Sequence, residues 1–392
     1  MSRQQILRIL HIDVEGGFGG SSRSLLMYVI GIQRLQAKNY SSHVLCKTAG
    51  PIQLIYDKLG TSCEVFPHML HRIPLVKYNF RNCITTVPKF LDIFRLHQKI
   101  VSCKPDIVHL NHAGLMLNGV LLKFSSFKGH IVIHSRVIWP QNAFSRFFTH
   151  LLLRSSDHVI AIAAPVRQAH IANGFPPDKI SVIHNPSISS CTSDNSDQRD
   201  QSVCRISYFG TIGNLKGPDR LIELADVLEK REFPFDIRIF GAPPRRRSLT
   251  KKLDGELVSI LERQKKASDL YHFLYEGHVA DPESRIAASD FIVRPSREND
   301  PWGRDVIETM SHGKVIIATG YFDGFVKNDS NGFIVGEWDV NRVADIIIDT
   351  WSNPRSYAKI CKNAINFAKT EFALETAASK FIATLADLNK VK

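Results

Sequence analysis

The sequence lacks any uninterrupted apolar run of the roughly 18 residues that a helix needs to span a bilayer. Its first residues, 1–14, also lack an apolar core followed by a small-residue cleavage site, and residues 6–14 are typical of a buried strand instead. From these absences we expect neither a transmembrane helix nor a signal peptide. We expect a cytoplasmic protein whose membrane contact, if it makes one, is peripheral and on the inner face.

Cysteine is scarce as well, with seven residues scattered along the chain. None of them forms a Cys-x-x-Cys pair with a histidine partner, so the pattern predicts neither a zinc site nor a disulfide framework. Reduced thiols suit a cytoplasmic protein. No other metal-ligand cluster is visible in the sequence, so we expect no metal, and we expect no cofactor.

Acidic residues are few in the first half of the chain. Residues 1–190 hold 21 Lys and Arg against 8 Asp and Glu, whereas residues 191–392 hold 29 against 30. A basic half beside a neutral half favours an anionic partner, such as anionic lipid, a pyrophosphate-linked lipid or nucleic acid. A basic surface that serves only solubility is the alternative. Nucleic acid is disfavoured because no aromatic-rich platform or basic reading helix is present.

At 392 residues the chain is long enough for two domains. Residues 187–203 are crowded with Ser, Asp, Asn and Gln and have almost nothing to bury, so they are predicted to be a linker. We expect a first domain at residues 1–186, a second at 204–370, and a final helical segment at 371–392.

Residues 291–319 have the pattern strand, loop, helix, strand. The apolar run Phe291–Val293 predicts a buried strand, and residues 294–303 contain the Pro, Asn, Asp and Gly of a loop. Residues 304–312 favour a helix that ends at Gly313, and Val315–Ala318 predicts the next strand. Ligands of open α/β sheets bind outside the carboxyl ends of the strands, so the acids of this loop are candidate site residues.

This stretch resembles the Glu-x7-Glu signature of retaining GT-B glycosyltransferases of family 4, also called group 1. Asp300 and Glu308 bracket seven residues that include Trp302-Gly303, and residues 313–318 match the family's closing strand. The resemblance implies that Glu308 binds the ribose of a nucleotide sugar and that the loop acid binds the transferred sugar. Asp300 stands where a Glu is usual, and Glu298 is the alternative. Carboxylates suit vicinal hydroxyls because charged acceptors make stronger hydrogen bonds.

Glycines follow the first predicted strand, where a backbone can approach a phosphate closely. A dinucleotide-binding Rossmann domain would also need an acid after its second strand, and residues 47–50 contain none. In the resemblance to GT-B proteins, Gly19 and Gly20 match the Gly-Gly loop that faces the sugar diphosphate. Family members also place a histidine near the transferred sugar. In the resemblance, His134 is the candidate for that histidine.

The second half begins with a strand at residues 204–210 and a loop that contains Lys216, Gly217 and Pro218. This loop resembles the family's phosphate clamp, in which an Arg and a Lys hold the diphosphate. Lys216 matches the Lys, but Thr211 occupies the position of the Arg. The resemblance therefore leaves Arg294, Arg297 and Arg304 as candidates to supply the missing charge.

The resemblance implies a GT-B fold, with two Rossmann-like α/β domains that face each other across a cleft and a C-terminal helix that crosses back. The implied activity is transfer of a sugar from a UDP- or GDP-linked donor, with retention and without a metal. We expect a glycan or lipid-linked acceptor in surface polysaccharide or glycolipid synthesis. A non-catalytic GT-B protein that binds a glycan or a partner is the alternative. Residues 68–95, which mix basic and apolar side chains, are the predicted segment for contact with an anionic membrane.

Overall fold

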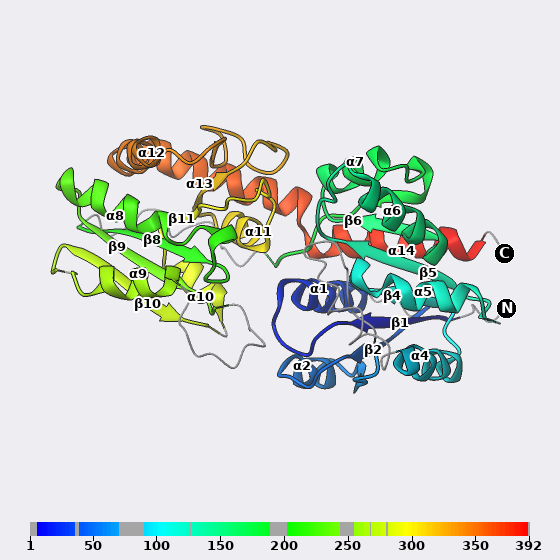
Figure 1. Cartoon of the computed structure of the whole chain (residues 1–392). Helices are drawn as coiled ribbons and strands as arrows, with labels where there is room; N and C mark the ends of the chain where they lie inside the picture. Colours follow the sequence, from blue (N-terminus) through cyan, green and yellow to red (C-terminus); the bar gives the residue numbers. More distant parts are fainter. Residues whose placement is uncertain are drawn as a thin grey trace. The chain divides into compact units, whose positions relative to one another are not determined.

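The structure is a computed structural model that describes residues 6–35, 39–69, 90–125, 127–188, 202–243, 255–266, 268–279 and 281–390. The chain divides into two compact units. The first unit comprises Met1–Pro186 together with Leu374–Lys392, and the second comprises Ser187–Ala373 (Figure 1). Most of the predicted linker, residues 189–201, lies outside the described residues.

The first unit is built on a parallel sheet of seven strands in the order β3-β2-β1-β4-β5-β6-β7. Its order reverses beside β1, the point where such sheets leave room for a ligand. The middle strands are almost entirely buried because helices cover both faces of the sheet. The strands are β1 (Leu7–Asp13), β2 (Tyr40–Cys46), β3 (Ser62–Val65), β4 (Ile107–Leu110), β5 (His130–Ser135), β6 (His158–Ala161) and β7 (Ile180–Val182).

The helices of the first unit alternate with these strands, and the last helix of the chain joins them. Helix α14 packs against α1 so closely that a Cβ on Gly31 would lie 2.6 Å from the Cβ of Ala378. Phe381 and Leu385 of α14 are fully buried in the core of this unit. The helices are α1 (Gly20–Arg34), α2 (Ile52–Lys58), α4 (Phe90–Cys103), α5 (Met116–Lys123), α6 (Ala143–Ser155), α7 (Ala164–Ala172) and α14 (Leu374–Lys390).

The second unit holds a parallel sheet of six strands in the order β10-β9-β8-β11-β12-β13. The strands are β8 (Cys204–Phe209), β9 (Phe235–Phe240), β10 (Tyr271–Gly277), β11 (Phe291–Arg294), β12 (Val315–Thr319) and β13 (Phe333–Val335). The helices are α8 (Arg220–Lys230), α9 (Gly255–Gln264), α10 (Pro282–Ala287), α11 (Arg304–Ser311), α12 (Val340–Ser352) and α13 (Pro354–Glu371).

The predicted fold class is confirmed, since both units are Rossmann-like layers of helices around a parallel sheet. Helix α1 begins at Gly20, so residues 14–19 form the loop after β1 and Gly20 already belongs to the helix. None of the described helices combines the length and apolar character needed to cross a bilayer. Of the predicted membrane segment 68–95, residues 70–89 lie outside the described residues.

Candidate functional site

The predicted strand–loop–helix–strand motif is confirmed as β11, the loop 295–303, α11 and β12. Strand β11 lies between β8 and β12, so the loop emerges at the carboxyl edge of the sheet. The loop that carries Lys216 lies against it. Gly217 has φ +66°, and a Cβ there would lie 2.1 Å from the carbonyl oxygen of Pro295. Only glycine allows this approach, which brings Lys216 next to the acids.

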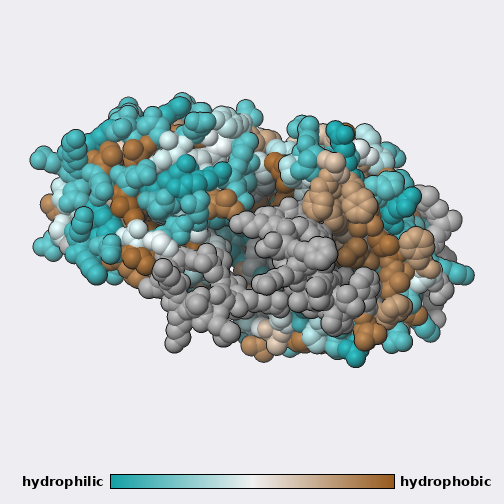
Figure 2. All heavy atoms as spheres, in the orientation of Figure 1, coloured by the Kyte–Doolittle hydropathy of each residue, from teal (hydrophilic) through white to brown (hydrophobic). Residues whose placement is uncertain are grey.

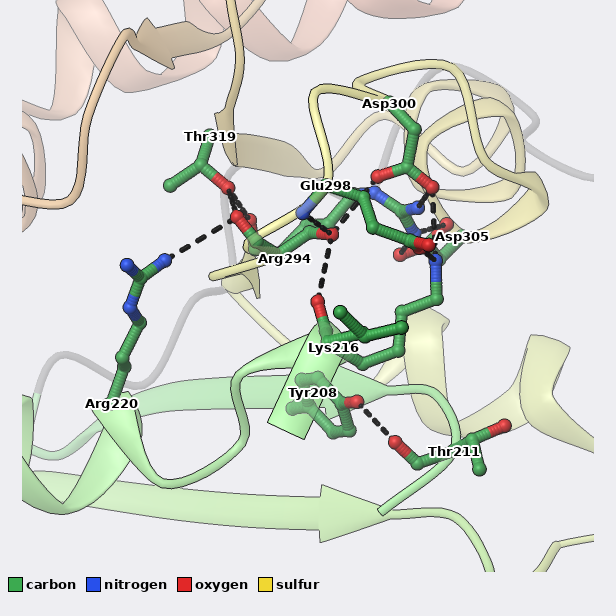
Figure 3. Close-up of polar contacts among 11 residues, drawn as sticks. Tyr208, Thr211, Lys216, Arg220, Arg294, Glu298, Asp300, Asp305 and Thr319 are labelled. Atoms are coloured by element: carbon green, nitrogen blue, oxygen red, sulfur yellow. Dashed lines mark hydrogen bonds and ion pairs between the residues drawn. The ribbon is translucent and has the colours of Figure 1, made fainter. Parts of the chain in front are cut away.

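Lys216 and the loop acids form one ion cluster (Figure 3). The Lys216 ammonium donates to Glu298 Oε2 at 2.5 Å and to Asp300 Oδ2 at 2.9 Å. Arg294, the last residue of β11, donates to the same Asp300 oxygen at 2.6 Å and to both oxygens of Asp305 at 2.6 Å. Asp300 therefore lies between two cations, whereas Glu298 contacts one of them.

Asp300 is also the better anchored of the two candidate acids. Ser296 donates its hydroxyl to Asp300 Oδ1 at 3.0 Å. The side chain of Asp300 is 24% exposed, against 42% for Glu298. Because hydrogen bonds and burial restrict its rotamers, Asp300 has the more fixed position.

Arg294 is the buried centre of this cluster. Burial alone would lower the pKa of its guanidinium, but the negative charges of Asp305 and Asp300 raise that pKa above the usual value. The arginine is therefore permanently charged, and its hydrogen bonds fix the carboxylates of Asp300 and Asp305 in place.

Glu308 lies on the buried side of α11, one turn beyond Arg304. Arg304 donates to Glu308 Oε1 through Nε at 2.9 Å and through a terminal nitrogen at 2.6 Å. Glu308 is 2% exposed. Helical spacing of four residues brings the two side chains together. Arg304 thus fixes the orientation of the Glu308 carboxylate. At the start of α11, the N-cap residue Gly303 contributes no side-chain hydrogen bond.

All three arginines predicted to replace the missing clamp residue make ion pairs. Arg294 and Arg304 bind the acids described above. Arg297 binds Asp219 through two bonds of 2.8 and 2.6 Å. Thr211 itself is exposed, and its carbonyl accepts a hydrogen bond from Tyr208 at 2.9 Å.

Sequence reasoning missed Arg220, the first residue of α8. Arg220 donates to the carbonyl oxygens of Pro295 at 3.0 Å and Ser296 at 3.3 Å. Its guanidinium lies 5.6 Å from the centre of the Trp338 ring. Thr319, at the end of β12, donates to the same Ser296 carbonyl at 2.5 Å. Arg220 and Thr319 thus fix the backbone on which the acids stand. Backbone acceptors leave no sequence signal, so this role could not be predicted.

The carboxyl edge of the first sheet holds a second polar network. Arg136, which follows β5, donates to the Asn111 side chain at 2.6 Å and to Asn185 at 2.8 Å. Asn111, which follows β4, donates to the buried carboxyl of Asp13 at 3.0 Å. Burial raises the pKa of Asp13. These polar residues each follow a strand, and that position is the signal that could have found them.

The predicted glycines lie at this same edge. Gly19 is the N-cap of α1 and Gly20 is its first residue. A Cβ on Gly19 would clash with the Glu15 carboxylate, so the absence of a side chain makes room for that acid. The sequence did not predict that an acid, Glu15, would lie beside the glycines of the predicted phosphate-binding loop.

His134 lies in the interior of the first unit. Its Nδ1 is 2.7 Å from His109 Nε2, and His109 Nδ1 is 2.9 Å from His11 Nδ1. All three rings are fully buried, and Phe381 of α14 packs against them. Solvent does not reach His134, so a role at a bound sugar would require its neighbours to move.

Both halves of the chain match known protein families. Residues 19–186 match the family described as Glycosyltransferase Family 4, and residues 195–367 match Glycosyl transferases group 1. No curated protein is significantly similar to the sequence.

Solved structures with the same fold cover nearly all of the chain. HepE of Anabaena in complex with UDP-glucose is 20% identical, with a TM-score of 0.74, and the match covers 97% of this chain and 100% of HepE. A TarM structure from S. aureus, in complex with Fondaparinux, alpha-GlcNAc-glycerol and UDP, is 12% identical with a TM-score of 0.71, covering 97% and 100%. Sucrose-phosphate synthase from Thermosynechococcus elongatus is 16% identical with a TM-score of 0.72, covering 98% and 100%.

Proposed function

This chain belongs to the GT-B glycosyltransferases, its first half to family 4 and its second half to group 1, and we propose that it transfers a sugar from a UDP-linked donor with retention of configuration. The observation that carries the proposal is that the loop before α11 holds Asp300 against Lys216, while Arg304 orients the buried Glu308 on α11 itself. The complexes of HepE with UDP-glucose and of TarM with UDP support a UDP-linked donor. A GDP-linked donor is the alternative.

Glu308 binds the ribose hydroxyls in this proposal. A buried carboxylate whose orientation is fixed by Arg304 accepts hydrogen bonds without losing much side-chain entropy. The amide groups at the start of α11, which no side chain caps, favour the negative charge of the diphosphate.

Lys216 binds the diphosphate and stabilises the charge that develops on it as the sugar leaves. Without a ligand, this lysine is shared by Glu298 and Asp300. A diphosphate carries more charge than either carboxylate and replaces them. Asp300 remains held by Arg294 and Ser296, so it is left in position to accept bonds from the sugar hydroxyls. We therefore assign Asp300, rather than the more exposed Glu298, as the acid that positions the sugar.

The acceptor in this proposal is a glycan or a lipid-linked sugar, supported by the excess of basic residues in the first half. Gly19, Gly20 and His134 remain proposed site residues on the first unit. We also propose that turnover needs no metal.

The test is thermal stabilisation by a panel of UDP- and GDP-linked sugars, because a ligand that binds only the native state raises its melting temperature. The Glu308→Ala variant should lose about 10- to 100-fold in donor affinity, as expected for a hydrogen bond to a charged group. Glu262→Ala, which removes an exposed acid on α9, is the matched control. Stabilisation of the Glu308→Ala variant equal to that of the native protein would contradict the assignment.

Slow release of free sugar from the donor, followed with time, separates an enzyme from the non-catalytic alternative. The anomeric configuration of the first sugar released or transferred, read by NMR, tests retention. Complete absence of turnover with every donor that binds would favour the non-catalytic protein.

A further inference from the structure

Three neighbouring helices of the first unit, α4, α5 and α6, expose large apolar side chains to solvent. Helix α5 packs between the other two. Figure 2 shows brown, hydrophobic surface over the part of the molecule where Figure 1 places these helices. We call this the α4–α6 face, and its exposed apolar residues are Leu91, Phe94, Val101, Phe124, Phe144 and Phe147.

These residues follow the helical repeat, so they form stripes on the outer side. On α4 they stand at positions 91, 94 and 101, and on α6 at 144 and 147. Phe94 is 57% exposed, Phe147 63% and Phe124 81%. Exposed aromatic residues in such number on one face mark a contact surface rather than a solvated one.

Basic residues outnumber acidic ones on the α4–α6 face. The sequences of α4, α5 and α6 contain Arg95, Lys99, Lys123, Arg146 and Arg154 but a single acid, Asp92. Arg95, Lys99 and Lys123 pair with Asp92, Glu64 and Asp157, whereas Arg146 and Arg154 make no ion pair with any described residue. An apolar stripe flanked by unpaired basic residues complements an anionic lipid surface, where aromatic rings enter the interface and cations meet phosphates.

A basic pocket adjoins this face at the amino edge of the first sheet. Its volume is about 240 Å³, and its lining includes Val101 from the α4 stripe and the cations of Arg8, Lys104 and Lys128. Asp106, the acid of the pocket, already accepts from Arg8 at 2.9, 3.2 and 3.3 Å. Lys104 and Lys128 make no ion pair with the described part of the chain. The pocket therefore has two uncompensated charges next to an apolar surface.

The backbone at Lys104 supports a role for that side chain. Lys104 has φ +46°, a left-handed conformation that is uncommon for residues other than glycine. Glycine would serve better as a simple end for α4, so a lysine in this conformation points to a function for its charge.

We propose that the α4–α6 face docks on a bilayer that contains anionic phospholipid, with a lipid phosphate held by Lys104 and Lys128. The apolar stripes enter the interface beside that pocket. Phe94 and Arg95 also belong to the membrane segment predicted from the sequence, but α5, α6 and the pocket extend the contact beyond it. This inference does not depend on the proposed donor site, because its residues lie on the first unit alone.

The test is sedimentation of the full chain with vesicles of phosphatidylcholine, with and without phosphatidylglycerol. The native protein should sediment with the anionic vesicles at low salt. Lys104→Glu/Lys128→Glu should lower the partition at least about tenfold, as expected when two attractive charges become repulsive near the surface. Phe94→Ser/Phe147→Ser should lower it to a similar extent, and both side chains are exposed enough for the fold to survive.

Matched controls come from the second unit. Lys359→Glu/Lys362→Glu changes two exposed charges on α13, and Val258→Ser/Leu270→Ser removes two exposed apolar side chains. Both controls should sediment like the native protein. The proposal is overturned if the native protein ignores anionic vesicles, or if the controls lose as much binding as the paired variants.

Two further results would also overturn it. Release of the native protein from vesicles by millimolar glycerol phosphate, without any effect of the Phe94→Ser/Phe147→Ser pair, would mean that the pocket binds a free phosphate. A change from dimer to monomer in the Phe94→Ser/Phe147→Ser variant, seen by light scattering, would mean that the face joins two copies of this chain. UDP stabilisation of each variant, measured in parallel, shows that the fold and the second unit are intact.

Discussion

The second unit buries a charged group at the end of a central strand, where Arg294 holds Asp300 and Asp305 with bonds of 2.6 Å. In the first unit, the corresponding sheet buries His11, His109 and His134, which stand in a hydrogen-bonded row on three adjacent strands. Both sheets are parallel and open, so the fold does not dictate this difference. What differs is location, since the ion cluster follows strand ends and the histidines lie within strands beneath α14.

Burying a charge is costly unless it is paired, whereas a neutral imidazole needs only hydrogen bonds. The ion cluster around Arg294 meets this requirement by pairing its charges at the carboxyl edge of the sheet. The histidine row makes polar contacts in a core without any charge. The contrast predicts that different changes destabilise the two clusters. The ion cluster should lose stability when a charged partner is removed, and the histidine row should lose stability on acidification.

Removing Arg294 should have the largest effect. Arg294→Met leaves Asp300 and Asp305 without their buried partner, and breaking such a pair costs about 3–5 kcal/mol of unfolding free energy. Urea titration measures it. Arg297→Met is the control, because the Arg297–Asp219 pair is about equally accessible on both sides and should contribute no more than about 1 kcal/mol. Equal losses for the two variants would remove Arg294 from the centre of the cluster.

Acid should selectively weaken the histidine row. Burial lowers the pKa of His11 to about 3 and also lowers the pKa values of His109 and His134 well below their usual range, with Arg136 opposing the charged forms of both. The folded state therefore keeps neutral rings while the unfolded state takes up protons below about pH 6.5. Stability is full above that pH and is lost as the pH falls.

Three such groups should remove about 3 kcal/mol between about pH 6.5 and 5.5, roughly 1 kcal/mol each. Unfolding by urea at both pH values measures this loss, and His109→Gln should reduce the dependence by about one third. An unchanged dependence in that variant would show that other groups cause it. The comparison with Arg294→Met, whose loss should be the same at both pH values, separates the two clusters.

The two loop acids should differ in their effect on catalysis. Asp300→Ala should lower turnover about 10- to 100-fold, equivalent to one hydrogen bond to a charged group, with little change in donor affinity. Glu298→Ala should change turnover by less, because Glu298 is more exposed and contacts a single cation of the cluster. Steady-state kinetics with the donor found by thermal stabilisation decide between them. If Glu298→Ala abolishes activity while Asp300→Ala is silent, the assignment of the loop is reversed.

Lys216→Ala should have the smallest effect that is still diagnostic. A point charge acts on phosphate and not on the base, so the variant should bind UDP several-fold more weakly and uridine unchanged. Calorimetric titration of both ligands measures the difference. Arg220→Lys gives a useful comparison, since Arg220 binds backbone carbonyls rather than the ion cluster. Equal loss for UDP and uridine in Lys216→Ala would place Lys216 away from the phosphates.

The sequence predicted the ends of β11, α11 and β12 closely because apolar runs, loop residues and Gly313 mark them locally. The resemblance to the family's phosphate clamp singled out Lys216, which the structure places against Asp300. The sequence did not predict that Arg294 would be buried between two acids, because no local pattern shows that the loop 295–303 turns back to bring Asp300 and Asp305 onto Arg294. The burial of His134 was equally hidden, since its cover, Phe381, comes from the far end of the chain.

The return of α14 to the first unit has a consequence for synthesis of the protein. The second unit is one continuous stretch, but the first needs residues on both sides of it. A ribosome that has finished residue 186 has therefore not yet delivered the helix that covers the histidine row. The unit that is translated first is the last to be completed. Until α14 is made, Tyr28 and the sheet of the first unit lack the cover that this helix provides. A truncation before residue 374 would thus uncover the core of the unit that is encoded at the other end of the gene.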